Sequence, residues 1–337
     1  MWRSTLILFI ACSSSPSGQG PDAARSDADD DAVADSNSPR FDAARDASSG
    51  GEVCFLPPVN QGRIASLALT EISGIAASRR NPRVLYVHND SGEPYARFFA
   101  IRDDGADLGE LRLMGADFDD WEDIAVAQGD NSSFVLLGDI GDNAAREGRP
   151  GRATIRILRI VEPLIDADAP AEDRSTFNWD RINLRYEDGP HDAEALLVDP
   201  RSDDIYLITK EEDGQSGVFV ARAPEFVPAT NSVDTIVLER VATIGFGTPI
   251  APGDPYATAG DMSPDGTGIL IRSYTMVHGW FGAADVSFSE RFTTPSAELP
   301  VAFEIQGEAI GFAADGKGYF TVSEGEQPTL SFYPRCD

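Results

Sequence analysis

The chain contains few cysteines and few cationic side chains. Its 337 residues include three cysteines, three histidines and 27 lysines and arginines, against 56 aspartates and glutamates. The resulting formal net charge of −29 argues against nucleic-acid binding and against direct adhesion to anionic lipid. The same acidity permits cation binding, and a saline habitat would explain it without any specific site.

Strong enzyme motifs are also missing. The sequence has no Gly-x-Ser-x-Gly elbow, no His-Glu-x-x-His and no phosphate-binding loop. His88 and His191 are the candidates for a general base, because a histidine titrates near neutral pH. A solvated loop histidine is the alternative interpretation of both.

The N-terminal segment has the features of an export signal. Arg3 supplies a positive charge, and the apolar run at 6–11 is too short to span a bilayer as a helix. The stretch Phe9-Ile-Ala-Cys12 resembles a bacterial lipoprotein signal, in which Cys12 becomes the lipidated residue. An ordinary signal peptide is the alternative. We expect residues 1–12 to direct export to the bacterial cell envelope, with membrane contact only through the lipid anchor.

Residues 13–52 contain almost no large apolar side chain. Such a stretch cannot bury enough surface to offset its ordering entropy, so we expect a disordered acidic linker. Residues 53–337 have a globular composition, and their length suits one large domain or two ordinary ones; we expect a single domain. Cys54 and Cys336 lie near the two ends of that domain, and oxidising conditions outside the cytoplasm favour a disulfide between them. Two unrelated buried cysteines are the alternative.

One short pattern recurs along this domain: an acidic residue, an apolar stretch, a turn and a second β-rich stretch. The five acidic residues are Glu71, Glu122, Glu194, Asp261 and Glu308. Their spacings of 51, 72, 67 and 47 residues, with no sustained helical periodicity, predict an all-β fold. A β-propeller of five four-stranded blades is favoured, and six blades are possible. The strand expected at 63–69 would fill the outer position of the last blade and close the ring.

A polar cluster follows each predicted second strand. Because that strand runs antiparallel to the innermost one, its end should lie near the start of the first, at one channel mouth. The residues expected to meet a ligand there are Glu71, Asn89, Asp90, Glu194, Lys210, Asp261, Arg272, Glu308 and Glu324. Lys210 and Arg272 would balance part of the negative charge.

A second set of residues is predicted to bind a metal. It comprises Glu122, Asp123, Asp139, Asp142 and Asn143. Carboxylate and amide oxygens suit Ca²⁺ or Mg²⁺ better than zinc, and we expect Ca²⁺. The alternative is architectural: the acidic residues at strand starts would then accept backbone N–H groups and bind nothing.

The stretches Glu71-Ile-Ser-Gly-Ile-Ala and Val84-Leu-Tyr-Val-His-Asn-Asp-Ser-Gly resemble the first blade of exported bacterial propellers of the SdiA-regulated and esterase-like phytase groups. Asp120-Trp-Glu-Asp-Ile-Ala and His191-Asp-Ala-Glu-Ala-Leu are similar to their acidic strand starts. The resemblance implies an extracytoplasmic propeller that binds calcium. The phytase group further implies phosphomonoester hydrolysis, but only Lys210 and Arg272 are available at the predicted mouth to hold phosphate.

Three functions are compatible with these observations. The first is an anchored propeller that binds a divalent cation and a small molecule or envelope partner at its channel mouth. The second is a metal-dependent esterase or phosphoesterase in which His88 or His191 moves a proton. The third is a structural envelope module without a binding site.

Overall fold

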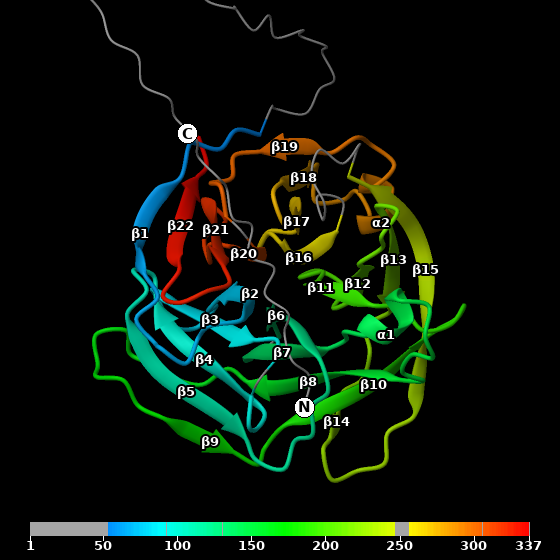
Figure 1. Ribbon diagram of the computed structural model, residues 1–337, viewed down its shortest axis with the longest axis horizontal. Coiled ribbons are helices and arrows are strands. Elements are labelled where there is room, and N and C mark those ends of the chain that lie inside the picture. The colour runs from blue at the N-terminus through cyan, green and yellow to red at the C-terminus, as the bar shows by residue number, and fades with distance from the viewer. Residues whose placement is uncertain (1–52, 92, 130, 247–255, 305, 337) are drawn as a thin grey trace, which may run out of the picture. The chain divides into compact units, whose positions relative to one another are not determined.

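The computed structural model describes residues 53–91, 93–129, 131–246, 256–304 and 306–336, and their fold is all-β, as predicted (Figure 1). Cys12, the predicted signal and the predicted linker lie outside the described residues, so these assignments stay predictions. Helical structure among the described residues is limited to α1 (Asn143–Arg146) and α2 (Phe288–Arg291). No helix in this part of the chain is long and apolar enough to cross a bilayer.

The described strands form four sheets, and two of them follow the chain order from the inside outward. The first sheet contains β2 (Ile72–Ala77), β3 (Val84–Asn89), β4 (Arg97–Arg102), β5 (Asp107–Leu113) and, parallel to β5, β9 (Arg174–Thr176). Another sheet contains β16 (Ala257–Met262), β17 (Gly268–Ser273), β18 (Val277–Phe281) and β19 (Ala297–Leu299). β9 is thus an additional outer strand, which a repeat of four strands does not include.

The largest sheet joins two predicted repeat units. Its path is β11 (Ala193–Val198), β12 (Ile205–Thr209), β13 (Gln215–Ala221), β15 (Thr235–Gly245), β10 (Asp180–Tyr186), β8 (Ile155–Val161), β7 (Ser133–Asp139) and β6 (Trp121–Gln128). The parallel pairing of β10 with β15 connects the two units, and β14 (Val227–Pro228) also pairs with β10. The end strands β6 and β11 contact each other, so the sheet is nearly closed.

The remaining sheet combines the two ends of the described chain. Its order is β1 (Val59–Arg63), β22 (Thr329–Pro334), β21 (Gly318–Ser323) and β20 (Gly307–Phe312). An N-terminal strand therefore fills the outer position beside the last strand, as predicted, but it ends where we expected it to begin. The segment after it does not join the ladder, because Ile64 N–H donates to Pro328 and Ala65 N–H donates to Gly105.

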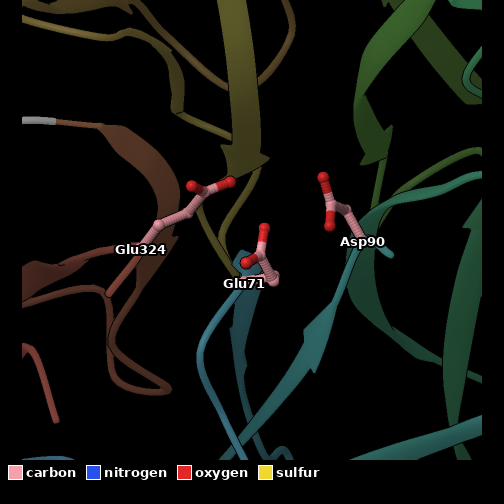
Figure 2. A group of neighbouring side chains, drawn as sticks. All are labelled: Glu71, Asp90 and Glu324. Carbon is pink, nitrogen blue, oxygen red and sulfur yellow. The ribbon is translucent and has the colours of Figure 1, made fainter. Parts of the chain in front are cut away.

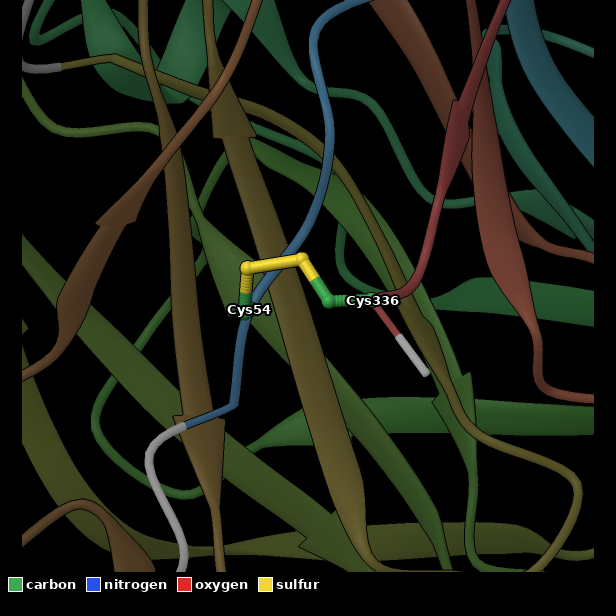
Figure 3. The surroundings of a disulfide bond; sticks show 2 residues. All are labelled: Cys54 and Cys336. Carbon is green, nitrogen blue, oxygen red and sulfur yellow. A yellow bond between two sulfur atoms is a disulfide. The ribbon is translucent and has the colours of Figure 1, made fainter.

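The predicted disulfide is confirmed. Cys54 and Cys336 are bonded, with their Cα atoms 5.3 Å apart at a sequence separation of 282 (Figure 3). The Cys336 N–H also donates to the Cys54 carbonyl at 2.9 Å, which continues the antiparallel pairing of β1 with β22. Closing so long a loop restricts the unfolded chain and contributes about 3–5 kcal/mol.

Five strands form the innermost layer: β2, β6, β11, β16 and β20. Each contacts the next, and β20 contacts β2, so the contacts return to the first strand (Figure 1). Most of their side chains are buried, and the apolar ones pack between neighbouring sheets. Because these strands contact side by side without a shared backbone ladder, their N–H groups need other acceptors.

Candidate functional site

Each innermost strand begins with a β-bulge at the same place in its pairing with the second strand. The bulged residues are Ser73, Glu122, Glu194, Thr258 and Glu308. The predicted equivalence of five acidic residues is therefore wrong at two positions. Glu71 lies two residues before its bulge, and Asp261 lies three residues after its own. A bulge leaves one residue unpaired and redirects its side chain, so the residue at the bulge meets different neighbours from those of a regular strand residue.

The two hydroxyl residues at these bulges have a structural role. Ser73 Oγ donates to the Glu122 carbonyl at 2.6 Å, and Thr258 Oγ1 donates to the Gly307 carbonyl at 2.8 Å. Each bond ties one innermost strand to the next. The three bulged glutamates, by contrast, are buried carboxylates that face the other charged groups near the strand starts.

Two residues before the bulge, three of the five strands again carry an acid: Glu71, Asp120 and Asp192. The second strands add Asp90, Lys210, Tyr274 and Glu324 at this level. Their placement follows from backbone pairing, because Asp90 N–H donates to Glu71 and Lys210 N–H donates to Asp192. Glu324 N–H likewise donates to the residue before β20. The predicted convergence of strand starts and second-strand ends is thus present for these residues.

Two groups of three carboxylates result, each with one oxygen per residue and all three oxygens within 4.8 Å of one another. The inner triad is Glu122, Asp192 and Glu194, and it is buried. The outer triad is Glu71, Asp90 and Glu324, which are partly exposed. Figure 2 shows the three outer side chains directed toward a common space from the residue before β2, the residue after β3 and the residue after β21.

The inner triad carries more negative charge than its cationic neighbours balance. Lys210 Nζ lies 2.7 Å from Glu194 Oε1, and Arg146 Nε lies 2.8 Å from Asp192 Oδ2. Burial nevertheless raises the pKa of Glu122 well above its usual range, with further contributions from Glu194, Asp120 and Asp192. Burial also raises the pKa of Glu194, although Lys210 opposes that shift. No described residue donates a hydrogen bond to the Glu122 carboxylate.

Glu308 extends this cluster from a third innermost strand. Its side chain is only 5% exposed, and its buried Oε2 atom has no hydrogen-bond partner. Burial raises the pKa of Glu308, Lys210 lowers it, and Asp90 raises it, so Glu308 lies within electrostatic reach of both triads. Burial and the Asp192 charge raise the pKa of Asp120 to about 6. Burial together with Glu308 and Asp90 raises the pKa of Glu324 to about 8.

A glycine permits the close packing of these carboxylates. Gly141 follows β7, and a Cβ atom there would collide with the carboxylates of Glu122 and Asp120. The absence of a side chain therefore leaves the carboxylates room beside the backbone.

Asp123 and Asp261 serve the architecture instead. Asp123 Oδ2 accepts from Leu196 N–H at 2.9 Å and from Gly260 N–H at 3.3 Å, so it bridges β6 to β11 and β16. Asp261 Oδ2 accepts from Phe312 N–H at 2.7 Å and so joins β16 to β20. These two aspartates satisfy N–H groups of strands that lack a shared ladder. The architectural interpretation therefore describes them, and Asp261 does not belong to either triad.

Three other residues of the predicted metal set lie outside both triads. Asp139 is fully buried and paired with Arg152 at 2.9 Å and with Arg156 at 2.5 Å. Asp142 caps α1 and accepts from the Arg152 N–H, while the Asn143 amide oxygen accepts from Arg146. Only Glu122 of the five predicted residues belongs to a group whose oxygens converge.

Neither histidine is placed to act on a ligand among these carboxylates. His88 is buried in β3, and burial lowers its pKa to about 4. Its Nε2 has no partner and packs against Gly74. His191 lies between Glu211 at 3.2 Å and Asp188 at 2.9 Å, and these hydrogen bonds raise its pKa.

Two further residues of the predicted mouth, Asn89 and Arg272, have structural roles. Asn89 Oδ1 accepts from Glu71 N–H at 3.1 Å, while its amide donates to the Ala68 carbonyl and so fixes the start of β2. Arg272 is fully buried, where it pairs with Glu304 at 2.6 Å and donates to the Ala309 carbonyl. The Arg272 charge is thus paired with Glu304.

Asp120 and Asp192 belong to the acidic cluster but to neither of the two predicted sets of site residues. A signal for them exists: Asp120-Trp-Glu122 and Asp192-Ala-Glu194 share an Asp-x-Glu spacing. In a regular strand, residues two apart point to the same face, so an Asp-x-Glu spacing at a strand start can bring two carboxylates to one side.

Comparison of the chain with protein-family models and with curated proteins gives no match. The resemblance to the SdiA-regulated and esterase-like phytase groups therefore stays a prediction.

Proposed function

We propose that residues 53–337 form a five-bladed β-propeller whose channel mouth binds a divalent cation, Ca²⁺, together with a small molecule or an envelope partner. We also propose that the protein is exported and anchored by a lipid on Cys12. Five innermost strands that contact in a closed order, with an N-terminal strand beside the last one, support the propeller. The disulfide supports an oxidising compartment.

The observation that carries the cation proposal is the inner triad together with Glu308. Three buried carboxylates lie within 4.8 Å, beside a fourth with a buried, unpartnered oxygen. Lys210 and Arg146 are the cations paired with this group, and Arg272, which also acts on Glu308, is itself paired with Glu304. Buried carboxylates of this kind either keep protons or bind a cation. A divalent cation would restore their ionisation and supply the missing partner.

The donor atoms favour calcium among the divalent cations. The triads offer carboxylate oxygens only, with no thiolate or imidazole among the described members. Hard oxygen ligands select Ca²⁺ or Mg²⁺, and Ca²⁺ accepts irregular sets of six to eight oxygens at about 2.3–2.6 Å. Coordination positions that the protein does not fill would be open to a carboxylate, hydroxyl or phosphate oxygen of a ligand.

The hydrolase alternative is not favoured by a specific observation. His88 is buried and His191 is paired with two carboxylates, so neither offers a free base to a substrate at the mouth. The purely structural alternative is also weakened. Asp123 and Asp261 accept the N–H groups of Leu196, Gly260 and Phe312 between innermost strands. No hydrogen bond among the described residues gives the bulged glutamates the same role.

Thermal unfolding with and without Ca²⁺ tests the proposal. At free Ca²⁺ about 100 times Kd, we expect the melting temperature to rise by about 5–10 °C and a chelator to reverse it. Glu122→Gln should abolish the rise, while Glu298→Gln, at an exposed position on β19, should leave it intact. An unchanged melting temperature of the unaltered chain at millimolar Ca²⁺ would contradict the proposal.

A further inference from the structure

A cavity of about 250 Å³ lies at the opposite ends of the innermost strands from the triads. Its lining comes from the last residues of three of these strands and from the turns that follow two others. Representative lining residues are Arg79, Val126, Val198, Asp261, Met262 and Ala314. The proposed cation site does not involve this cavity.

The cavity is separate from the channel mouth. Asp261 lies three residues beyond its bulge, which corresponds to about 10 Å along a strand. Asp123, which bridges three innermost strands one residue beyond the bulge level, lies between the two regions along β6. A ligand in the cavity would therefore not contact the triads.

Two opposite charges line the cavity without pairing directly. Arg79 Nη1 is buried and has no hydrogen-bond partner. The Arg79 charge is close enough to lower the pKa of Asp261, against the larger effect of burial. Yet among the ion pairs of the described residues, none within 4.0 Å joins Arg79 to Asp261. Arg79 Nη1 thus lacks an acceptor, although a carboxylate lines the same cavity.

Asp261 also has acceptor capacity left. Each of its oxygens takes one backbone N–H, from Met262 at 2.7 Å and from Phe312 at 2.7 Å. A carboxylate oxygen accepts two hydrogen bonds, so each oxygen can accept another. The cavity therefore offers a donor at Arg79 and acceptors at Asp261.

We propose that this cavity binds a small zwitterion that carries a carboxylate and an ammonium group, as a free α-amino acid does. The ligand carboxylate accepts from Arg79 Nη1, and the ligand ammonium donates to Asp261. Because the two protein charges cancel, a ligand without net charge avoids leaving an unbalanced buried charge. The volume lies just below the usual range for drug-sized ligands, which suits a compound of amino-acid size.

Calorimetric titration of the intact protein with the individual standard amino acids tests this inference. We expect at least one of them to bind saturably at millimolar concentration or below. Its N-acetyl and methyl-ester derivatives, which each lack one charge, should bind at least about tenfold more weakly. Failure of every amino acid to bind, or equal binding of the derivatives, would overturn the inference and indicate a cavity filled by water alone.

Variants locate the binding. Arg79→Gln should weaken it at least about tenfold, whereas Arg80→Gln, at the exposed neighbouring arginine that bonds the Glu162 carbonyl, should not. Ala314→Trp fills the cavity without changing either charge and should also abolish binding. Binding that survives in both Arg79→Gln and Ala314→Trp would contradict the site.

The outcome is distinguishable from that of the cation proposal. Glu122→Gln and removal of Ca²⁺ should leave amino-acid binding unchanged, because the triads lie at the other end of the strands. Loss of amino-acid binding on chelation would contradict a separate site.

Discussion

Glu122 and Asp123 are consecutive in β6, and both carboxylates are buried, but their surroundings differ. Asp123 accepts hydrogen bonds from the N–H groups of Ile124, Leu196 and Gly260. Glu122, at the bulge, faces Glu194, Asp120 and Asp192. The bulge and the alternation of the strand turn the two side chains in different directions. Burial alone therefore does not show whether a carboxylate binds a ligand or has a structural role. The groups that donate hydrogen bonds to it decide between the two.

The largest expected effect concerns the structural member of this pair. Asp123→Ala leaves three buried N–H groups without an acceptor, so we expect the free energy of unfolding to fall by about 3–5 kcal/mol. Asp123→Asn keeps one acceptor oxygen and should lose less. Urea unfolding measures both, and an Asp123→Ala variant as stable as the unaltered chain would show that the bridging bonds contribute little.

The second expected effect concerns the other member. Glu122→Gln removes a carboxylate whose pKa is raised by burial and by neighbouring acids, so the metal-free protein should become more stable. Its melting temperature should respond to Ca²⁺ by less than about 2 °C, compared with about 5–10 °C for the unaltered chain. Equal responses to Ca²⁺ in the two proteins would place the cation elsewhere.

A third effect is a dependence of stability on pH in the absence of metal. Burial raises the pKa of Glu194 and Glu324 to about 8, above the unfolded value, so the folded state holds more protons than the unfolded state. Their contribution to stability is full below about pH 4–5 and is lost as the pH rises to about 8. Urea unfolding of the metal-free protein should show this decline, and Ca²⁺ should reduce it because it stabilises the ionised carboxylates. A decline of equal size with Ca²⁺ would contradict the proposal that protons and Ca²⁺ bind to the same carboxylates.

The smallest effect is expected at the outer triad. Glu71 is partly exposed, so water screens its interaction with a cation more than that of Glu122. We expect Glu71→Gln to weaken Ca²⁺ binding about two- to fivefold, as measured by calorimetry, and to retain most of the thermal shift. If Glu71→Gln abolishes Ca²⁺ binding while Glu122→Gln does not, the outer triad contributes more to binding than the inner triad, which would contradict this prediction.

Much of the fold could be predicted from the sequence because the chain marks it locally. Continuous apolar runs such as Val84–Val87 and Ile205–Ile208 predict buried strands, and both lie in second strands of their sheets. The position of two cysteines near the two ends of the domain predicts the disulfide that joins them. The strand expected at 63–69 was wrong because Ile64 and Leu69 are buried in a connecting segment, where apolar side chains pack without ladder bonds.

The site was harder to predict, because register cannot be read from an acidic residue alone. Glu71 and Asp261 look like Glu122 in sequence, but the bulges at Ser73 and Thr258 place them two residues before and three residues after the equivalent position. A shift of this kind changes which groups a side chain meets. Asp139 was assigned to a metal for its acidity, whereas the arginines that neutralise it come from 13 or more residues later in the chain.

The most direct test of the central claim is a calorimetric titration of Ca²⁺ into the chelator-treated protein and into its Glu122→Gln variant, with Glu298→Gln as the control. We expect saturable binding to the unaltered chain and to the control, and none to Glu122→Gln over the same range. Absence of binding to the unaltered chain, or equal binding to all three proteins, would contradict the claim that the bulged carboxylates hold the cation.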